Sequence, residues 1–334
     1  MVGAVYDRGY RGYEGIRGGR SASRYALFLA SVRRALGIRR PWRQKVAPAV
    51  LLGIATVPAI VWVGVAYVTR DTPASNFQLI TYRDYVGVST YLLAFVALTA
   101  PDIMCPDRRQ RVLPLIFARP LTGTDYVVAK VGAMFALVFA FGFLPQVVLF
   151  VGQMLVSDDG ALRYARDNAE VLWQVPVAVG LLAIYYASIS VAVSSFTTRR
   201  IIAGAVIIGS LLISGIVSEI LVGPEEATVQ EGPAIEDAGP PSTFVTEDGQ
   251  VIAVPSDQGT FGPVEVRREP TYAALVNLLT LPLVVRDLVF LGEVEAGHPL
   301  STLDHSGLYA LALFLLVVLV ALALLLWRYD EVER

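Results

Sequence analysis

Side chains that could carry out chemistry are few in this sequence, and their spacing matches no catalytic or metal-binding pattern. A phosphate-binding P-loop ends in Gly-Lys-Ser or Gly-Lys-Thr, whereas the two lysines, Lys45 and Lys130, follow Gln and Ala. His298, Asp304 and His305 could hold a metal ion, but a pair of surface histidines is the simpler interpretation, because spacing alone fixes no ligand geometry. Neither HExxH nor GxSxG occurs. We therefore expect no catalytic residue, metal site or cofactor in this chain.

The other soft or ionisable side chains lie near the ends of apolar segments. Asp102 and Glu219 are close enough to a segment end to be solvated. Cys105 is the only cysteine and cannot form an internal disulfide. Together with Met104 it is better explained by packing than by binding of a soft metal. No line of carboxylates runs through the apolar segments, which weakens the case for a proton-coupled carrier.

Six apolar segments dominate the chain, each long enough for a helix that crosses about 30 Å of hydrocarbon. Hydrophobic residues make up 55% of the 334 residues and charged residues only 17%, against about 25% charged in an average soluble domain. The expected fold class is an all-α polytopic membrane protein with six transmembrane helices. The predicted spans are 46–68, 85–105, 126–156, 171–196, 201–222 and 307–327.

The basic residues lie mostly on one side of these spans. Twenty of the 27 fall in segments that would share a side with residues 1–45. Lys and Arg accumulate on the cytoplasmic side of a membrane, so we predict that both termini are cytoplasmic. The expected organisation is a basic N-terminal part (1–45), spans one to five (46–222), an extracytoplasmic insertion (223–306) and the sixth span with a short cytoplasmic tail (307–334).

Residues 271–291 form a further apolar segment that is short for a span. About 15 apolar residues precede Arg286, and Pro282 interrupts them. A span here would bury Arg286 and Asp287 in the bilayer at high cost. We therefore prefer a re-entrant or interfacial helix pair. The alternative, a true span, would place the C-terminus outside.

Residues 21–40 have the pattern of a helix that lies in the cytoplasmic interface of the membrane. Apolar side chains recur at helical spacing, and arginines fall largely on other faces. The apolar residues are Tyr25, Phe28, Leu29, Val32 and Leu36, and the arginines include Arg24, Arg33 and Arg34. A solvated basic tail is the alternative.

The loop after the second span predicts another short cytoplasmic helix over residues 107–119. Asp107 would cap this helix, and Pro120 would end it. Residues 122–125 then supply a turn and an N-cap for the third span. The basic residues of the helix are Arg108, Arg109, Arg111 and Arg119, and its apolar residues are Leu113, Leu115, Ile116 and Phe117. These two faces suit docking into a groove of a cytoplasmic partner, and a solvated connector is the alternative.

The outer segment 223–270 is rich in Pro, Gly and acidic residues. Within it, residues 243–254 predict a β-hairpin with its turn at Asp248-Gly249, since β-branched residues flank that pair. Residues 261–267 could add an edge strand. We expect a small extracytoplasmic β element here, which could bind another extracytoplasmic protein.

The order of these elements resembles the membrane subunit of an ATP-binding-cassette (ABC) transporter of the ABC-2 permease type. The stretch LPLIFARPLTGTDYVVAK at 113–130 is similar to that family's leucines, Arg-Pro, polar turn, Tyr and Lys at the start of the third helix. The run YDRGYRGYEG at 6–15 looks like the start of bacterial members. The 223–270 insertion departs from the pattern, because it is longer than in the simplest members.

The resemblance implies a complex in the bacterial inner membrane. Two permease chains, identical or paralogous, would pair in the lipid bilayer above two cytoplasmic ABC ATPase subunits that bind ATP and Mg²⁺. Residues 107–119 would be the coupling helix, 21–40 the elbow helix and 272–291 an outer half-helix pair. Export of a substrate along the interface of spans one, two and five is implied, and the apolar walls of that interface would suit a lipid-like or amphiphilic substrate. Small hydroxyl residues on spans two and five could line that interface, although packing is the simpler role; they are Ser89, Thr90, Ser210, Ser214 and Ser218.

Two other functions fit the same sequence. One is a membrane anchor or scaffold that transports nothing and recruits partners on both sides. The other is a membrane enzyme acting on lipids, for which Tyr82, Arg83 and Asp84 are the only tight polar group at the outer end of span two. These three residues are more typical of interface anchors. No feature of the sequence suggests binding of nucleic acid.

Overall fold

The computed structural model describes residues 18–38, 43–70, 81–86, 89–118, 120–157, 160–222, 242–245, 251–254, 272–295, 298–301 and 303–333. Six helices in these ranges are long and apolar enough to cross a membrane, which confirms the six predicted spans. At 1.5 Å rise per residue, helices of this length match the roughly 30 Å of hydrocarbon. They are α2 (Arg43–Thr69), α4 (Ser89–Arg109), α6 (Gly123–Val156), α8 (Val171–Ser195), α9 (Arg200–Val222) and α11 (Ser306–Glu333).

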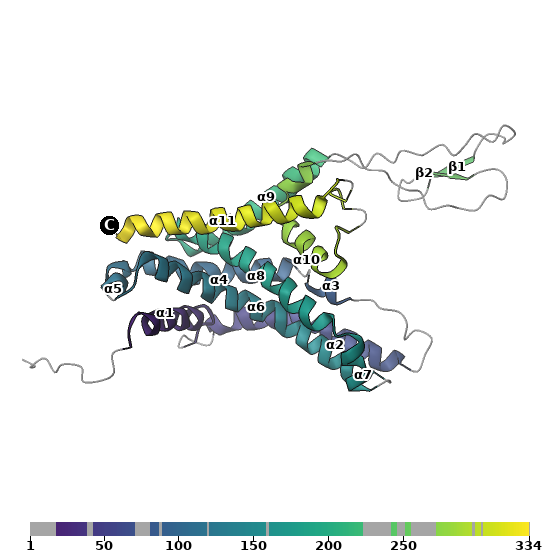
Figure 1. The fold of residues 1–334 in the computed structure, drawn as a ribbon, viewed down its shortest axis with the longest axis horizontal. Coiled ribbons are helices and arrows are strands. Elements are labelled where there is room, and N and C mark those ends of the chain that lie inside the picture. Colours follow the sequence, from purple (N-terminus) through teal and green to yellow (C-terminus); the bar gives the residue numbers. More distant parts are fainter. Residues whose placement is uncertain are drawn as a thin grey trace, which may run out of the picture.

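Shorter elements lie at the two ends of this bundle (Figure 1). We call one end the α5 end; it carries α5 (Leu113–Phe117), α1 (Arg20–Ala35) and the C-terminal end of α11. The other, the α10 end, carries the remaining short helices. These are α3 (Tyr82–Val86), α7 (Ala161–Asp167), the 3-10 helix η2 (Tyr272–Val276) and α10 (Leu281–Leu291).

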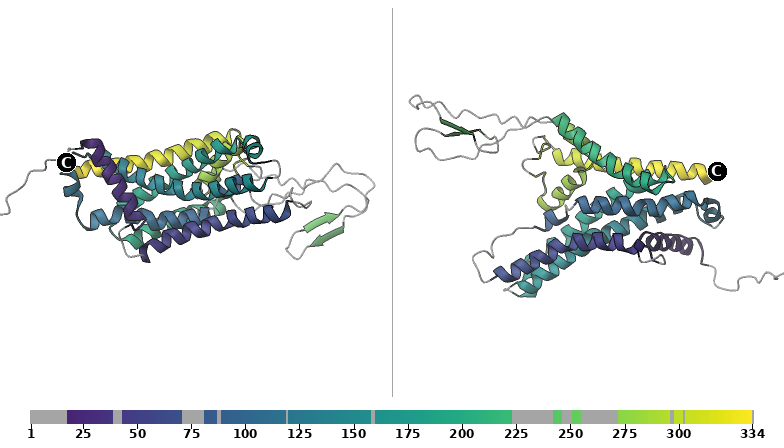
Figure 2. Two further views of the ribbon diagram at one scale, coloured as in Figure 1. Left: turned by 90° about the horizontal axis from the view of Figure 1, so that it is seen from below. Right: turned by 180° about the vertical axis from the view of Figure 1, so that it is seen from behind.

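The centre of the bundle is formed by α4, α6 and α8. Helix α8 packs against α6, α4, α11 and α10, and small side chains such as Ala183, Ala187 and Ser190 on its buried face allow these close contacts. The helices diverge toward the α10 end, where α10 lies between α9–α11 and α2–α6 (Figure 2). Helices α2, α9 and α11 leave most of their apolar side chains exposed, as expected for surfaces in contact with lipid or with another helix.

Helices α4 and α9 approach closely at Gly204. A Cβ atom added to this glycine would lie 2.9 Å from the main-chain oxygen of Ala97 on α4. Gly209, one further turn along α9, has open space at the same position. The absence of a side chain at Gly204 is therefore what allows this contact.

The third span begins as the sequence predicts. Thr122 is the N-cap of α6, and its hydroxyl accepts a hydrogen bond from the Asp125 N–H, while the Asp125 carboxylate accepts one from the Thr122 N–H. Two otherwise unpaired donors at the helix start are satisfied in this way. Helix α6 then continues through Pro145 to Val156.

Residues 272–295 do not contain a helix that could span. Helix α10 has 11 residues, about 16 Å at 1.5 Å per residue, which is half the hydrocarbon thickness. In the insertion before it, β1 (Ser242–Val245) pairs with β2 (Val251–Val254) in an antiparallel register that places Thr243 opposite Ala253. The turn at 248–249 and the predicted edge strand at 261–267 lie outside the described residues.

Candidate functional site

A buried group of charges joins three helices at the α5 end. The Asp107 carboxylate lies at the end of α4, 2.5 Å from the Lys130 ammonium of α6. It also pairs with Arg34 of α1 and accepts a hydrogen bond of 3.0 Å from the Tyr126 hydroxyl. Lys130 donates a second hydrogen bond, of 2.9 Å, to the Ile103 carbonyl. The side chains of Asp107 and Lys130 are almost fully buried, so each neutralises the other in a low-dielectric setting.

These contacts correct the prediction of one helix over 107–119. Asp107 does not cap a new helix, because its carboxylate is used by Lys130 and Arg34, and α4 continues to Arg109. A turn follows, in which Arg111 has a φ of 52°, and only then does the five-residue α5 begin. The segment is therefore the last turns of α4, a reversal and a short helix.

Helix α1 is held against the bundle at both of its ends. Arg34 pairs with Asp107 near its C-terminus, and near its N-terminus Arg20 lies 2.6 Å from the Asp125 carboxylate of α6. Arg24 adds a longer contact of 3.5 Å to the same carboxylate. The left view of Figure 2 shows α1 crossing the long helices at a steep angle.

The predicted interfacial helix is thus confirmed as a helix, but its amphipathic faces are used differently. Arg34 was expected at lipid head groups and instead pairs with the buried Asp107 carboxylate while its own side chain remains 30% exposed, and Arg33 stays exposed. On the apolar face, Val32 and Leu36 pack on the core, and Tyr25 remains exposed. The other two apolar residues of the predicted face, Phe28 and Leu29, are half-buried.

Helix α5 packs on the core with one side and exposes the other. Leu113, Ile116 and Phe117 pack against the core, and the Phe117 ring lies 6.0 Å from that of Tyr126. Leu115 faces outward with 71% of its surface exposed. With the exposed Arg109 and Arg111, it forms what we call the α5 surface. Arg119 lies outside the described residues.

A cavity of about 290 Å³ adjoins the α5 surface. Ala26 and Ala30 of α1 line one side, and Leu115 lies on the other, with Asp107 and Lys130 also among its lining residues. A partner side chain that contacts Leu115 could enter this cavity and reach the buried charges.

The α8–α9 turn is tied to the same end of the bundle. The Ser195 carbonyl accepts hydrogen bonds from Arg108 of α4 and, at 3.2 Å, from Arg328 of α11. Arg108 therefore has a positioning contact within the chain and is not part of the exposed surface that was predicted for it.

The hydroxyl residues predicted for a translocation interface contact their own chain. Ser214 accepts a hydrogen bond of 3.1 Å from the Leu278 N–H, and Ser218 donates one of 3.3 Å to the Ala273 carbonyl. Ser210 bonds the Ile207 carbonyl within α9. These contacts hold η2 and the turn that precedes α10 on α9, which is a packing role. The side chains of the other two residues, Ser89 and Thr90, lie outside the described part of the structure.

The α10 end has a charge network that the sequence did not predict. Arg83 lies 2.5 Å from Glu295 and 3.7 Å from Asp287, and Arg286 lies 2.6 Å from Asp287. Burial raises the pKa of the Asp287 carboxyl, while its ion pairs with Arg286 and Arg83 oppose that rise. The pairing explains how two adjacent charges are tolerated in the apolar segment 271–291. Within the described residues, no group of three His, Cys, Asp or Glu side chains could hold a metal ion.

Comparisons with protein-family models, curated proteins and solved structures found no match for this chain. Its function must therefore be inferred from the geometry described above.

Proposed function

We propose that this chain is the membrane-spanning permease subunit of an ATP-driven ABC transporter of the ABC-2 type. The observation that supports it is the α5 surface. An exposed Leu115 stands on a short helix at one end of a six-helix bundle, and the helix is fixed from behind by Ile116 and Phe117. An apolar side chain on a fixed base is suited to a groove in a partner protein.

In this proposal the α5 end is cytoplasmic, as the excess of Lys and Arg in its segments favours. Both termini then lie on the cytoplasmic side of the bacterial inner membrane, and the β1–β2 insertion lies on the opposite side. The α5 surface docks on a separate ABC ATPase subunit, which binds ATP and Mg²⁺. Two such subunits serve a pair of permeases, identical or paralogous.

Motion at the ATPase would pass through the contacts of Asp107, Lys130 and Arg34, because these tie α1, α4 and α6 into one unit at the docking site. Rocking of two such bundles about their interface would expose the substrate path to either side in turn. The exposed apolar faces of α2 and α9 suit a lipid-like or amphiphilic substrate, and the direction we propose is export.

Co-purification tests this proposal directly. The protein is extracted in a mild detergent from cells of its own source, and nucleotide hydrolysis by the co-purified material is measured. Leu115→Asp is expected to reduce the co-purified ATPase activity roughly tenfold or more, since a central apolar anchor contributes about 2 kcal/mol to a protein interface. The structure favours this change over one at Phe117, which packs on Tyr126 and would disturb the fold.

The matched control is Leu162→Asp on α7. Leu162 is 89% exposed and lies at the α10 end, so the same polar change should leave the ATPase bound. Equal loss from both variants would contradict a specific role for Leu115. Absence of any nucleotide-hydrolysing partner with the unmodified protein would favour the non-transporting anchor instead.

A further inference from the structure

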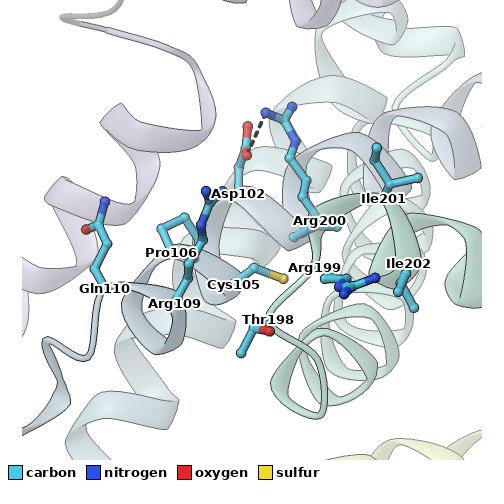
Figure 3. Close-up of a pocket in the computed structure, with 11 residues that line it drawn as sticks. Asp102, Cys105, Pro106, Arg109, Gln110, Thr198, Arg199, Arg200, Ile201 and Ile202 are labelled. Atoms are coloured by element: carbon cyan, nitrogen blue, oxygen red, sulfur yellow. Dashed lines mark ion pairs between the residues drawn. The ribbon is translucent and has the colours of Figure 1, made fainter.

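A cavity lined by arginines lies between the end of α4 and the start of α9. It is an open cavity of about 1260 Å³ at the α5 end of the bundle (Figure 3). Three arginines line it: Arg109 from α4, Arg199 from the α8–α9 turn and Arg200 at the start of α9. Asp102 is the one carboxylate among the lining residues. The cavity therefore carries an excess of positive charge.

The three arginines differ in whether they form an ion pair. Arg200 lies 3.0 Å from the Asp102 carboxylate, and Figure 3 shows the two side chains facing each other. Neither Arg109 nor Arg199 forms an ion pair with any carboxylate in the described ranges. Two guanidinium groups thus remain available to an anion that enters the cavity.

The backbone adds donors at the same place. Residues 200–202 line the cavity and are the first turn of α9. The N–H groups of a first helical turn have no acceptor within the helix, and they lie at the positive end of the helix dipole. Such donors bind phosphate groups in many proteins, and here they coincide with the three arginines.

The apolar part of the lining indicates what carries the phosphate. Ile201 and Ile202 border the cavity and are exposed, Ile201 by 86%. Val206 and Ile213 continue the exposed apolar surface along α9, away from the arginines. A ligand that fits both parts has an anionic head and a long apolar tail.

We propose that this cavity binds the phosphate head group of an anionic phospholipid, with its acyl chains along α9. Basic pockets between transmembrane helices are suited to such head groups. The proposal requires only that the bundle lies in a bilayer. It does not depend on the chain belonging to a transporter, because lipid retention is measured without an ATPase subunit, although Arg109 is also part of the α5 surface.

Native mass spectrometry of the detergent-solubilised protein tests the site. We expect it to retain dioleoyl phosphatidylglycerol in preference to dioleoyl phosphatidylcholine. Arg109→Gln combined with Arg199→Gln should weaken retention of phosphatidylglycerol about 25-fold, since each basic residue near a membrane surface contributes roughly a factor of five to binding of anionic lipid. Arg200 is left unchanged, because its loss would leave Asp102 without its partner.

Two further double variants show whether lost lipid retention is due to the lost charges at this site or to a general effect of substitution. Arg109→Lys with Arg199→Lys keeps both charges and should retain the lipid. Arg163→Gln with Arg166→Gln removes two charges from α7 at the opposite end and should change nothing. A photoactivatable phosphatidylglycerol added to the unmodified protein should label residues 101–110 and 198–202, which locates the site without any substitution.

Two results would overturn the proposal. One is equal retention of phosphatidylglycerol by the unmodified protein and by the variant that combines Arg109→Gln with Arg199→Gln. The other is thermal stabilisation by inorganic phosphate that equals the stabilisation by phosphatidylglycerol, which would assign the cavity to a free anion.

Discussion

Replacing Asp107 with Asn is expected to destabilise the folded protein by about 3–5 kcal/mol, because removing one member of a buried ion pair leaves its partner uncompensated. Asn has nearly the same volume as Asp, so packing is preserved and only the charge is lost. The Lys130 ammonium is buried, and its other contacts are the neutral Ile103 carbonyl and the Tyr126 ring, neither of which carries a charge. Thermal unfolding in detergent, followed by circular dichroism, measures the change.

Removing the other member of the pair should cost less. In Lys130→Met, Asp107 would keep the pair with Arg34 and the hydrogen bond from Tyr126. Combining Lys130→Met with Asp107→Asn should recover part of the stability lost in Asp107→Asn alone, since no buried charge would then be left without a partner.

The matched control is Asp167→Asn on α7. Asp167 also pairs with an arginine, Arg163, at 3.8 Å, but its side chain is 61% exposed. An exposed pair at this helical spacing contributes about 0.5 kcal/mol or less. Similar melting temperatures for Asp107→Asn and Asp167→Asn would show that the buried charges are not what holds α1, α4 and α6 together.

Gly204→Ala should destabilise the protein by about 1–3 kcal/mol, the usual cost of forcing extra atoms into a packed contact. The new Cβ would lie 2.9 Å from the Ala97 carbonyl oxygen, which belongs to the backbone of α4 and cannot rotate away. Helices α4 and α9 would have to separate. The same unfolding measurement detects the effect.

Gly209→Ala provides the comparison for this change. It makes the identical substitution on the same helix, where the added Cβ meets open space. It should leave stability unchanged or raise it by up to about 1 kcal/mol, because Ala is the better helix former. If Gly204→Ala were as stable as Gly209→Ala, the close approach of α4 and α9 would not limit the packing of the bundle.

The six spans could be predicted because membrane helices are specified by a long apolar run, which is a local property of the sequence. The N-cap of α6 is local in the same sense: residues 122–125 predicted it, and the structure shows it to be a capping box of Thr122 and Asp125. The short helix α10 could be anticipated because Arg286 and Asp287 make a span costly.

Contacts between distant segments could not be predicted. The pairing of Asp107 with Lys130 and Arg34 decides where α4 ends, yet no local pattern reveals it. One signal was present: Lys130 is a single charge in an apolar run, and such a charge requires a partner. The role of Ser214 and Ser218 likewise depends on η2 and the turn that follows it, which lie some 60 residues further along the chain.

The ion pairs of α1 also constrain the order in which the protein assembles. Arg34 and Asp107 are separated by 73 positions in the chain, and Arg20 and Asp125 by 105. During synthesis, α1 leaves the ribosome well before either acidic partner exists. It can take its final place only after α4 has inserted and α6 has begun to, so the earliest of the described helices to be synthesised is among the last to reach its final contacts.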